Sequence, residues 1–206
     1  GIQGISNQVD SVQMILSGDA NDHRFDVTTS GQNSNVNLSI QGQLSQTSWL
    51  GNWLSGDIKS SYANLTLLES FKIEADWGKQ QYQIAPHCWQ HFDNQLCIKQ
   101  AEFMHNTAAW NVSLKEFDVL SVVRRLVPGM SKIQTNSRLN LDIFGEWDIA
   151  QLPHANLRAN LSSGDWVFSE QDNFQLTLDE TLVEAQITPK NILAKINLSG
   201  NKVGSL

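Results

Sequence analysis

Two cysteines and two histidines lie close together near the middle of the chain, and their types could support metal binding or redox chemistry. The segment reads His87-Cys88-Trp89-Gln90-His91, and Cys97 follows shortly after. Thiolates and imidazoles are zinc ligands, so a zinc site is conceivable, although the spacing matches no standard zinc finger. A hairpin would bring Cys88 and Cys97 within disulfide range, in an oxidising compartment. The favoured interpretation is a Cys88–Cys97 disulfide with no metal site, and buried free thiols are the remaining alternative.

Few other residues stand in a catalytic arrangement. The sequence contains no Gly-x-Ser-x-Gly, no phosphate-binding glycine loop and no His-Glu-x-x-His. Asp179 and Glu180 are adjacent, but neighbours on a strand point to opposite faces and do not converge on one substrate. Solvated acids are also ordinary at a turn. We therefore expect a protein that is not an enzyme and that needs no cofactor.

The charge balance and the tryptophans limit the partners further. The formal net charge is −7, and the longest basic run is Arg124-Arg125. Because phosphate neutralisation supplies most of the affinity for nucleic acid, no nucleic acid partner is expected. Seven tryptophans could stack on sugar rings. Most of them fall in phase with Leu, Ile and Val, which favours a structural role.

A phrase of alternating apolar residues that leads to a glycine repeats along the chain. Leu139, Leu141 and Ile143 alternate with polar residues before Gly145, and residues 14–18, 38–42 and 196–200 repeat the pattern. Side chains of a strand alternate between two faces, so each phrase predicts a strand with one apolar and one polar face. The chain holds roughly fourteen such segments with short polar turns between them, which predicts an antiparallel meander.

The hydrophobic period changes once, over residues 117–126. Phe117, Leu120, Val123 and Leu126 have helical spacing, and Pro128-Gly129 follows. This predicts one short helix. No linker divides the chain, so we expect residues 1–206 to form a single continuous β unit. Since the sequence has neither an initiator Met nor a signal peptide, we also expect a fragment of a longer protein.

The apolar face of such a sheet must be covered or must enclose something. One short helix cannot cover so many strands, so the sheet is expected either to fold onto itself as a sandwich or to roll around an apolar interior. Glycines 18, 42, 145 and 200 are predicted to lie where strands end or bend. The residues predicted to line the apolar interior are Val36, Leu38, Ile40, Trp110, Val112, Leu114, Leu139, Leu141, Ile143, Leu157, Leu161, Phe174, Leu176, Leu178, Ile196 and Leu198.

A longer pattern connects the predicted strands with the predicted helix. It consists of Trp110-x-Val112-x-Leu114-x-x-Phe117-Asp118-Val119-Leu120, then Pro128-Gly129, then strands of the form Leu-x-Leu-x-Ile-x-Gly. With the upstream Tyr82-Gln83-Ile84 and the cysteine pair, this pattern resembles the TamB family over nearly the whole chain. The two tryptophans within residues 49–56 depart from the family pattern, as does Val127 before the proline.

The resemblance implies both a fold and a function. TamB proteins form a β-taco, a half-pipe of antiparallel strands with an apolar concave face. They are periplasmic proteins of Gram-negative bacteria, anchored in the inner membrane, and their outer-membrane partner is the barrel protein TamA. The implied roles are phospholipid transport and assembly of outer-membrane proteins and autotransporters, so the implied ligands are phospholipid acyl chains and unfolded outer-membrane strands. The alternative is an extracellular lectin-like β-sandwich that binds carbohydrate through tryptophan.

Overall fold

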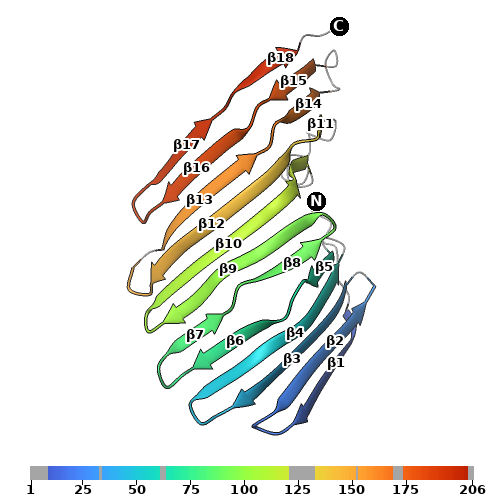
Figure 1. The fold of residues 1–206 in the computed structure, drawn as a ribbon, viewed down its shortest axis with the longest axis vertical. Helices are drawn as coiled ribbons and strands as arrows, with labels where there is room; N and C mark the ends of the chain where they lie inside the picture. The colour runs from blue at the N-terminus through green and yellow to red at the C-terminus, as the bar shows by residue number, and fades with distance from the viewer. Residues whose placement is uncertain are drawn as a thin grey trace, which may run out of the picture. The chain divides into compact units, whose positions relative to one another are not determined.

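The computed structural model describes residues 9–32, 34–60, 64–120, 133–151, 153–168 and 174–203, and these residues are almost entirely β-strand (Figure 1). The first ten strands are β1 (Val9–Gly18), β2 (His23–Gly31), β3 (Ser34–Leu44), β4 (Ser48–Ser60), β5 (Asn64–Leu67), β6 (Phe71–Asp76), β7 (Gln81–Ile84), β8 (His87–His91), β9 (Asn94–Met104) and β10 (Thr107–Asp118). The remaining strands are β11 (Ile133–Thr135), β12 (Arg138–Asp148), β13 (His154–Leu161), β14 (Gly164–Phe168), β15 (Phe174–Leu178), β16 (Thr181–Ile187), β17 (Ile192–Asn197) and β18 (Gly200–Val203). The predicted all-β antiparallel meander is confirmed.

The hydrogen-bonded strands form a large sheet of 14 strands and a second sheet of 4 strands. The chain also divides into two compact units, Gly1–Phe92 with Leu96–Trp110, and Asp93–Gln95 with Asn111–Leu206. We describe each unit by itself. That residues 1–206 act as a single domain stays a prediction.

The first unit places its alternating apolar residues on one face of its sheet. Antiparallel register pairs Phe25 with Ile40, and Val27 with Leu38. Leu38 is in turn opposite Gly56 on β4. Since paired residues project to the same side of a sheet, one face is apolar and the other carries the intervening polar residues. We call these the apolar face and the polar face.

Strands of the first unit are interrupted near their middles. Residues 68–70 separate β5 from β6, and residues 85–86 separate β7 from β8. Backbone pairing continues across the gaps, because the Leu68 N–H donates to the Cys88 carbonyl at 3.0 Å and the Ala85 N–H donates to the Lys72 carbonyl at 2.9 Å. The gaps therefore change the local direction of the strands without opening the sheet.

Four neighbouring strands of the second unit are interrupted in the same way. Short segments at residues 136–137, 162–163, 179–180 and 198–199, which are polar except for Leu198, divide the strands into two sets. The sets are β12-β13-β16-β17 and β11-β14-β15-β18, and they share the same lateral order (Figure 1). At the breaks, polar side chains bond to backbone groups. The Arg138 N–H donates to the Ser162 hydroxyl, and the Asp165 N–H donates to the Asn136 side-chain carbonyl, both at 2.9 Å. Side chains that compete for backbone partners in this way interrupt a regular ladder, so the described strands form two sheets instead of the one that was predicted.

The predicted helix and glycine positions have mixed outcomes. Phe117 and Asp118 end β10 and are not helical, Val119 and Leu120 are helical, and the rest of the predicted helix over 117–126 lies outside the described residues. Gly18 ends β1 with a φ of 93°, and Gly200 begins β18, as expected. Gly42 and Gly145 instead lie within β3 and β12, so the prediction is wrong for these two.

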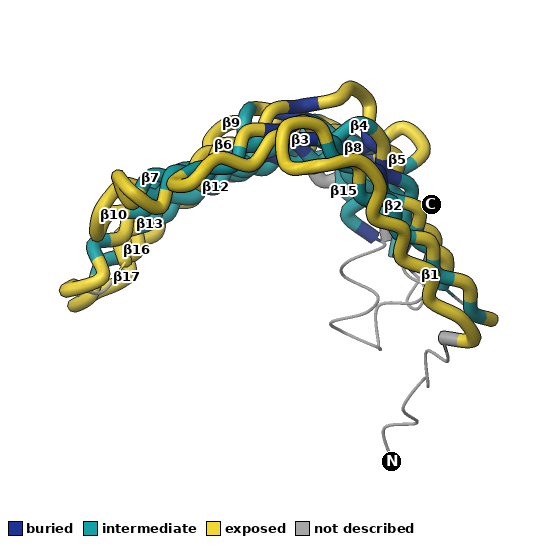
Figure 2. Tube along the Cα trace, turned by 90° about the horizontal axis from the view of Figure 1, so that it is seen from below, coloured by how far each residue is buried: buried dark blue, intermediate teal, exposed yellow. Residues whose placement is uncertain are grey.

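The described strands of each unit form one layer (Figure 2). Few apolar side chains are buried, and those in the first unit centre on Leu67, Phe71 and Trp89. Large apolar side chains on the outermost strands, such as Leu16 of β1 and Ile192 of β17, remain more than 70% exposed. Within the described part of each unit, no second sheet covers the apolar face. Among the same residues, no helix is long and apolar enough to cross a membrane.

Candidate functional site: an uncovered apolar face

The clearest candidate surface in the second unit is the apolar face of β12, β13, β16 and β17. Its side chains form transverse rows of paired residues, namely Leu139-Leu161-Thr181, Leu141-Ala159-Val183-Ile196, Ile143-Leu157-Ala185-Ala194 and Gly145-Ala155-Ile187-Ile192. No position in these rows carries a formal charge. The opposite face includes the row Asp142-Arg158-Glu184-Lys195, in which acidic and basic residues alternate. The two faces therefore differ sharply in what they can bind.

The structure distributes the predicted lining residues over several places. Six of them share the apolar face of the second unit, namely Leu139, Leu141, Ile143, Leu157, Leu161 and Ile196. Leu198 follows the end of β17 and is exposed. Phe174, Leu176 and Leu178 belong to β15 of the second sheet, in register with Phe168, Trp166 and Gly164. Trp110, Val112 and Leu114 alternate along β10, and Val36, Leu38 and Ile40 lie on β3 of the first unit. That any of these residues binds lipid stays a prediction.

The apolar face of the first unit holds an aromatic cluster of Trp53, Phe71, His87 and Trp89. Phe71 stacks on His87 with ring centroids 3.6 Å apart, and on Trp53 with centroids 5.6 Å apart. The rings of Trp89 and Trp53 form a T-shaped pair with centroids 6.1 Å apart. The cluster joins strands that are distant in sequence, which is why local patterning did not find it. Trp53 lies opposite Ile40, next to a register shift between Ser39 and Ile40.

The cysteines and histidines considered as zinc ligands have other partners. Cys88 and Cys97 form a disulfide between β8 and β9. His87 stacks within the aromatic cluster and its Nδ1 lies 2.9 Å from the Ala85 carbonyl oxygen. Among the described residues, no group of three or more His, Cys, Asp and Glu side chains could hold a metal ion. The alternation of β8 places Cys88 on the face opposite His87 and Trp89, so the disulfide lies away from the apolar face.

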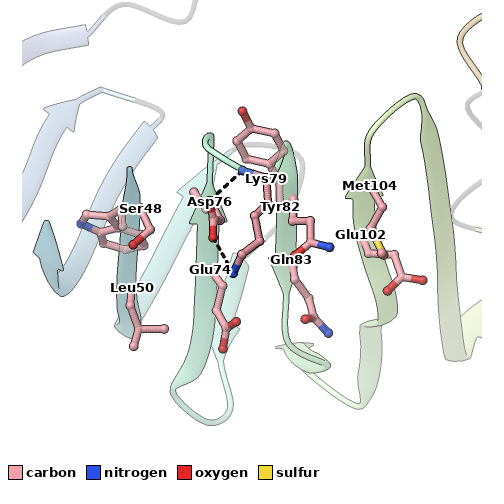
Figure 3. Close-up of a pocket in the computed structure, with 12 residues that line it drawn as sticks. Ser48, Leu50, Glu74, Asp76, Lys79, Tyr82, Gln83, Glu102 and Met104 are labelled. Atoms are coloured by element: carbon pink, nitrogen blue, oxygen red, sulfur yellow. Dashed lines mark hydrogen bonds and ion pairs between the residues drawn. The ribbon is translucent and has the colours of Figure 1, made fainter. Parts of the chain in front are cut away.

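The polar face of the first unit has a shallow depression of about 470 Å³ (Figure 3). Glu74, Gln83 and Glu102 form a row across its floor. Asp76 accepts a hydrogen bond from the Lys79 N–H at 2.9 Å and pairs with the Lys79 ammonium at 3.1 Å. The carboxylates are spread along the strands and do not converge on one point, so the depression resembles a solvated surface more than a catalytic site.

Acid should weaken the turn that Asp76 closes. The Lys79 backbone N–H, and then the Lys79 ammonium, hold the pKa of Asp76 below its ordinary value. A group whose pKa is lowered on folding stabilises the folded state above its unfolded pKa of about 3.9, and loses that contribution as the pH falls through the folded value. We expect the urea midpoint of Asp76→Asn to fall less than that of the wild type between pH 5 and 3. An identical fall in both proteins would contradict this assignment.

Comparison with known proteins assigns the chain to a family. The family model described as TamB, N-terminal domain, matches residues 2–206. The chain belongs to this TamB family. A curated relative, the translocation and assembly module subunit TamB of Haemophilus influenzae, is 23% identical over 196 residues, which cover 93% of this chain and 15% of the relative. No solved structure matches the chain. The TamB-family chain thus spans a small part of its relative's length, and the activity of the whole relative enters below as a proposal.

Proposed function

We propose that this TamB-family chain is a segment of a periplasmic conduit that moves phospholipids between the inner and outer membranes of a Gram-negative bacterium. The supporting observation is the uncharged, uncovered apolar face of the second unit. The name of the Haemophilus influenzae relative, a translocation and assembly module subunit, supports a role in the cell envelope. In this proposal an inner-membrane anchor and contacts with a TamA-like outer-membrane barrel come from regions outside these 206 residues.

The physical basis of the proposal is the transfer of acyl chains from water to the apolar rows. Each buried CH₂ group contributes about 0.8 kcal/mol, so an acyl chain gains substantially from lying on this face. The rows of Leu, Ile, Val and Ala repeat along the sheet with similar chemistry. Similar neighbouring sites differ little in affinity, so a lipid can pass from one to the next. This arrangement suits binding and transport, and it requires neither a catalytic residue nor a cofactor.

A charge placed on the apolar face should stop lipid movement. Leu141→Arg and Val183→Arg each introduce a guanidinium into the same transverse row. An arginine in an apolar phase costs about 3 kcal/mol, so we expect lipid transfer to fall by at least about tenfold. The measurement is transfer of a fluorescent phospholipid between donor and acceptor vesicles by the full-length protein.

The matched control for the charge experiment is Gln186→Arg, because Gln186 lies on the polar face of the same β16 strand. We expect it to transfer lipid at the wild-type rate. Circular dichroism and thermal melting establish that each variant is folded. Wild-type transfer by the folded Leu141→Arg and Val183→Arg proteins would refute the conduit.

A second candidate function is a scaffold for unfolded outer-membrane strands. The described sheet ends at β1 and β17, and both strands expose apolar side chains, including Met14 and Leu193. An edge strand can add an extended segment through main-chain hydrogen bonds. Crosslinks from β1 to an outer-membrane client protein, without crosslinks from the apolar face to lipid, would favour assembly of outer-membrane proteins and autotransporters over lipid transport.

A further inference from the structure

We propose that the Cys88–Cys97 disulfide is a thiol–disulfide exchange site, attacked at the Cys88 sulfur by a protein dithiol that docks in the depression beside it. The inference does not depend on the proposed lipid function, because it concerns the disulfide and a redox partner. In this proposal the disulfide has a chemical role in addition to joining β8 to β9.

The disulfide borders an open depression of about 350 Å³ in the first unit, and both cysteines line it. The other walls include exposed residues of the two strand interruptions and of β9, namely Leu68, Glu69, Pro86 and Lys99. Pockets that bind small molecules begin at about 300 Å³. The disulfide therefore has room beside it for an incoming cysteine side chain and its neighbours.

The two sulfur atoms differ in how easily a thiolate can reach them. Cys97 is only 4% exposed, whereas Cys88 is partly exposed. The alternation of β8 also places Cys88 on the face opposite the aromatic cluster, so the cluster does not cover it. Because the sulfur that is attacked depends on access, the incoming thiolate is expected at Cys88, and Cys97 becomes the leaving group.

Exchange at this site consists of two steps. A thiolate of the partner forms a bond to the Cys88 sulfur, the Cys88–Cys97 bond breaks, and its electron pair leaves with Cys97 as a thiolate. The second thiolate of the partner then attacks the partner's sulfur in this mixed disulfide and releases Cys88 as a thiolate. Both cysteines take protons from water. The chain has gained two electrons, and the partner has lost two by forming its own disulfide.

The position of Cys97 favours a dithiol over a monothiol as the partner. Backbone pairing holds β8 beside β9, so the Cys97 thiolate stays close to Cys88 after the first step. It attacks the mixed disulfide again at the high effective concentration of an intramolecular reaction, which expels a monothiol and restores the original bond. A dithiol resolves the mixed disulfide within its own chain and so competes with this return.

Charged groups at the depression should tune the rate of exchange. Lys99 lies two residues beyond Cys97 on β9, and its ammonium stabilises thiolates in the depression that both residues line. Glu69 lines the same depression and repels them. We expect Lys99→Gln to slow exchange by about two- to fivefold and Glu69→Gln to accelerate it by a similar factor, the range of an exposed charge pair.

The first experiment measures how fast dithiothreitol reduces the Cys88–Cys97 bond in the folded full-length protein and in the two charge variants. The freed thiols are alkylated, and the peptides that contain them are quantified by mass spectrometry. At equal thiolate concentration, 2-mercaptoethanol should give net reduction at least about tenfold more slowly. Equal rates with both thiols, or reduction only in urea that unfolds the sheet, would overturn the proposal.

Two single variants test which sulfur is within reach. Cys97→Ser leaves the Cys88 thiol free, and Cys88→Ser leaves the Cys97 thiol free. We expect the folded Cys97→Ser protein to react with the disulfide reagent dithiodipyridine at least about tenfold faster, because reactivity follows exposure. Equal rates, or a faster reaction of Cys97, would overturn attack at Cys88.

A leucine in the wall separates docking of a protein from access by a small thiol. Leu68 is 46% exposed beside the disulfide, and Leu50 is 49% exposed at a different depression. Leu68→Asn should slow reduction by thioredoxin, a protein dithiol, by about three- to tenfold through loss of an apolar contact. It should not change reduction by dithiothreitol, and Leu50→Asn should change neither rate. An unchanged thioredoxin rate in Leu68→Asn, or a wild-type disulfide that only dithiothreitol reduces, would overturn docking of a protein dithiol.

Discussion

Replacing Trp89 by alanine is expected to lower the free energy of unfolding of the first unit by about 3–5 kcal/mol. Trp89 is 8% exposed and belongs to the small buried group with Leu67 and Phe71. Its indole also covers Gly56 and forms a T-shaped pair with Trp53. A single-layer sheet has few other buried contacts to compensate, so the loss should approach the upper end of the range. Urea denaturation followed by circular dichroism measures it.

Phe92→Ala is the control for Trp89→Ala. Phe92 is also aromatic and lies in the same unit, but it is 74% exposed in the turn after β8. Surface substitutions usually change stability by less than about 0.5 kcal/mol. Similar losses in both variants would show that the aromatic cluster is not the centre of the core.

Removing the Cys88–Cys97 disulfide should cost about 2–3 kcal/mol, because a closed loop of this length restricts the unfolded chain by that amount. The bond joins β8 to β9 with a sequence separation of 9, on the face of β8 opposite the aromatic cluster. The double variant Cys88→Ser/Cys97→Ser is expected to unfold at a lower urea concentration than the oxidised wild type.

Reductant provides the control for the disulfide experiment. Dithiothreitol should lower the urea midpoint of the wild type to that of the double serine variant, and should leave the variant unchanged. A wild-type midpoint that does not respond to reductant would contradict a stabilising disulfide. Labelling of free thiols in protein taken directly from cells would also report whether the bond forms there, which the proposed periplasmic location requires.

The small core and the uncovered apolar face both follow from the single-layer sheet. Most proteins of this length bury their apolar surface in a shared core, whereas the described residues leave large apolar side chains exposed on β1 and β17. Backbone hydrogen bonds across the strands, the aromatic cluster and the disulfide then carry much of the stability. In the proposed function, the apolar surface that is not used for stability is the surface that binds lipid.

The sequence by itself determined the strands and their two faces. Alternation at Leu139, Leu141 and Ile143 correctly predicted which residues share a face, because the period of two is a local property of an extended chain. The family pattern around Trp110 also lay within the sequence, and the family model confirms the family.

Only the tertiary structure decided how the strands are divided between two sheets and which side chains pack on the glycines. The breaks at residues 136–137, 162–163 and 179–180 divide the second unit into two sheets because they align across neighbouring strands, and that alignment depends on register. Gly42 was predicted to mark a bend, yet it lies inside β3 under the Trp49 ring. A contact between two strands is set by pairing and packing, which periodicity along one strand does not encode.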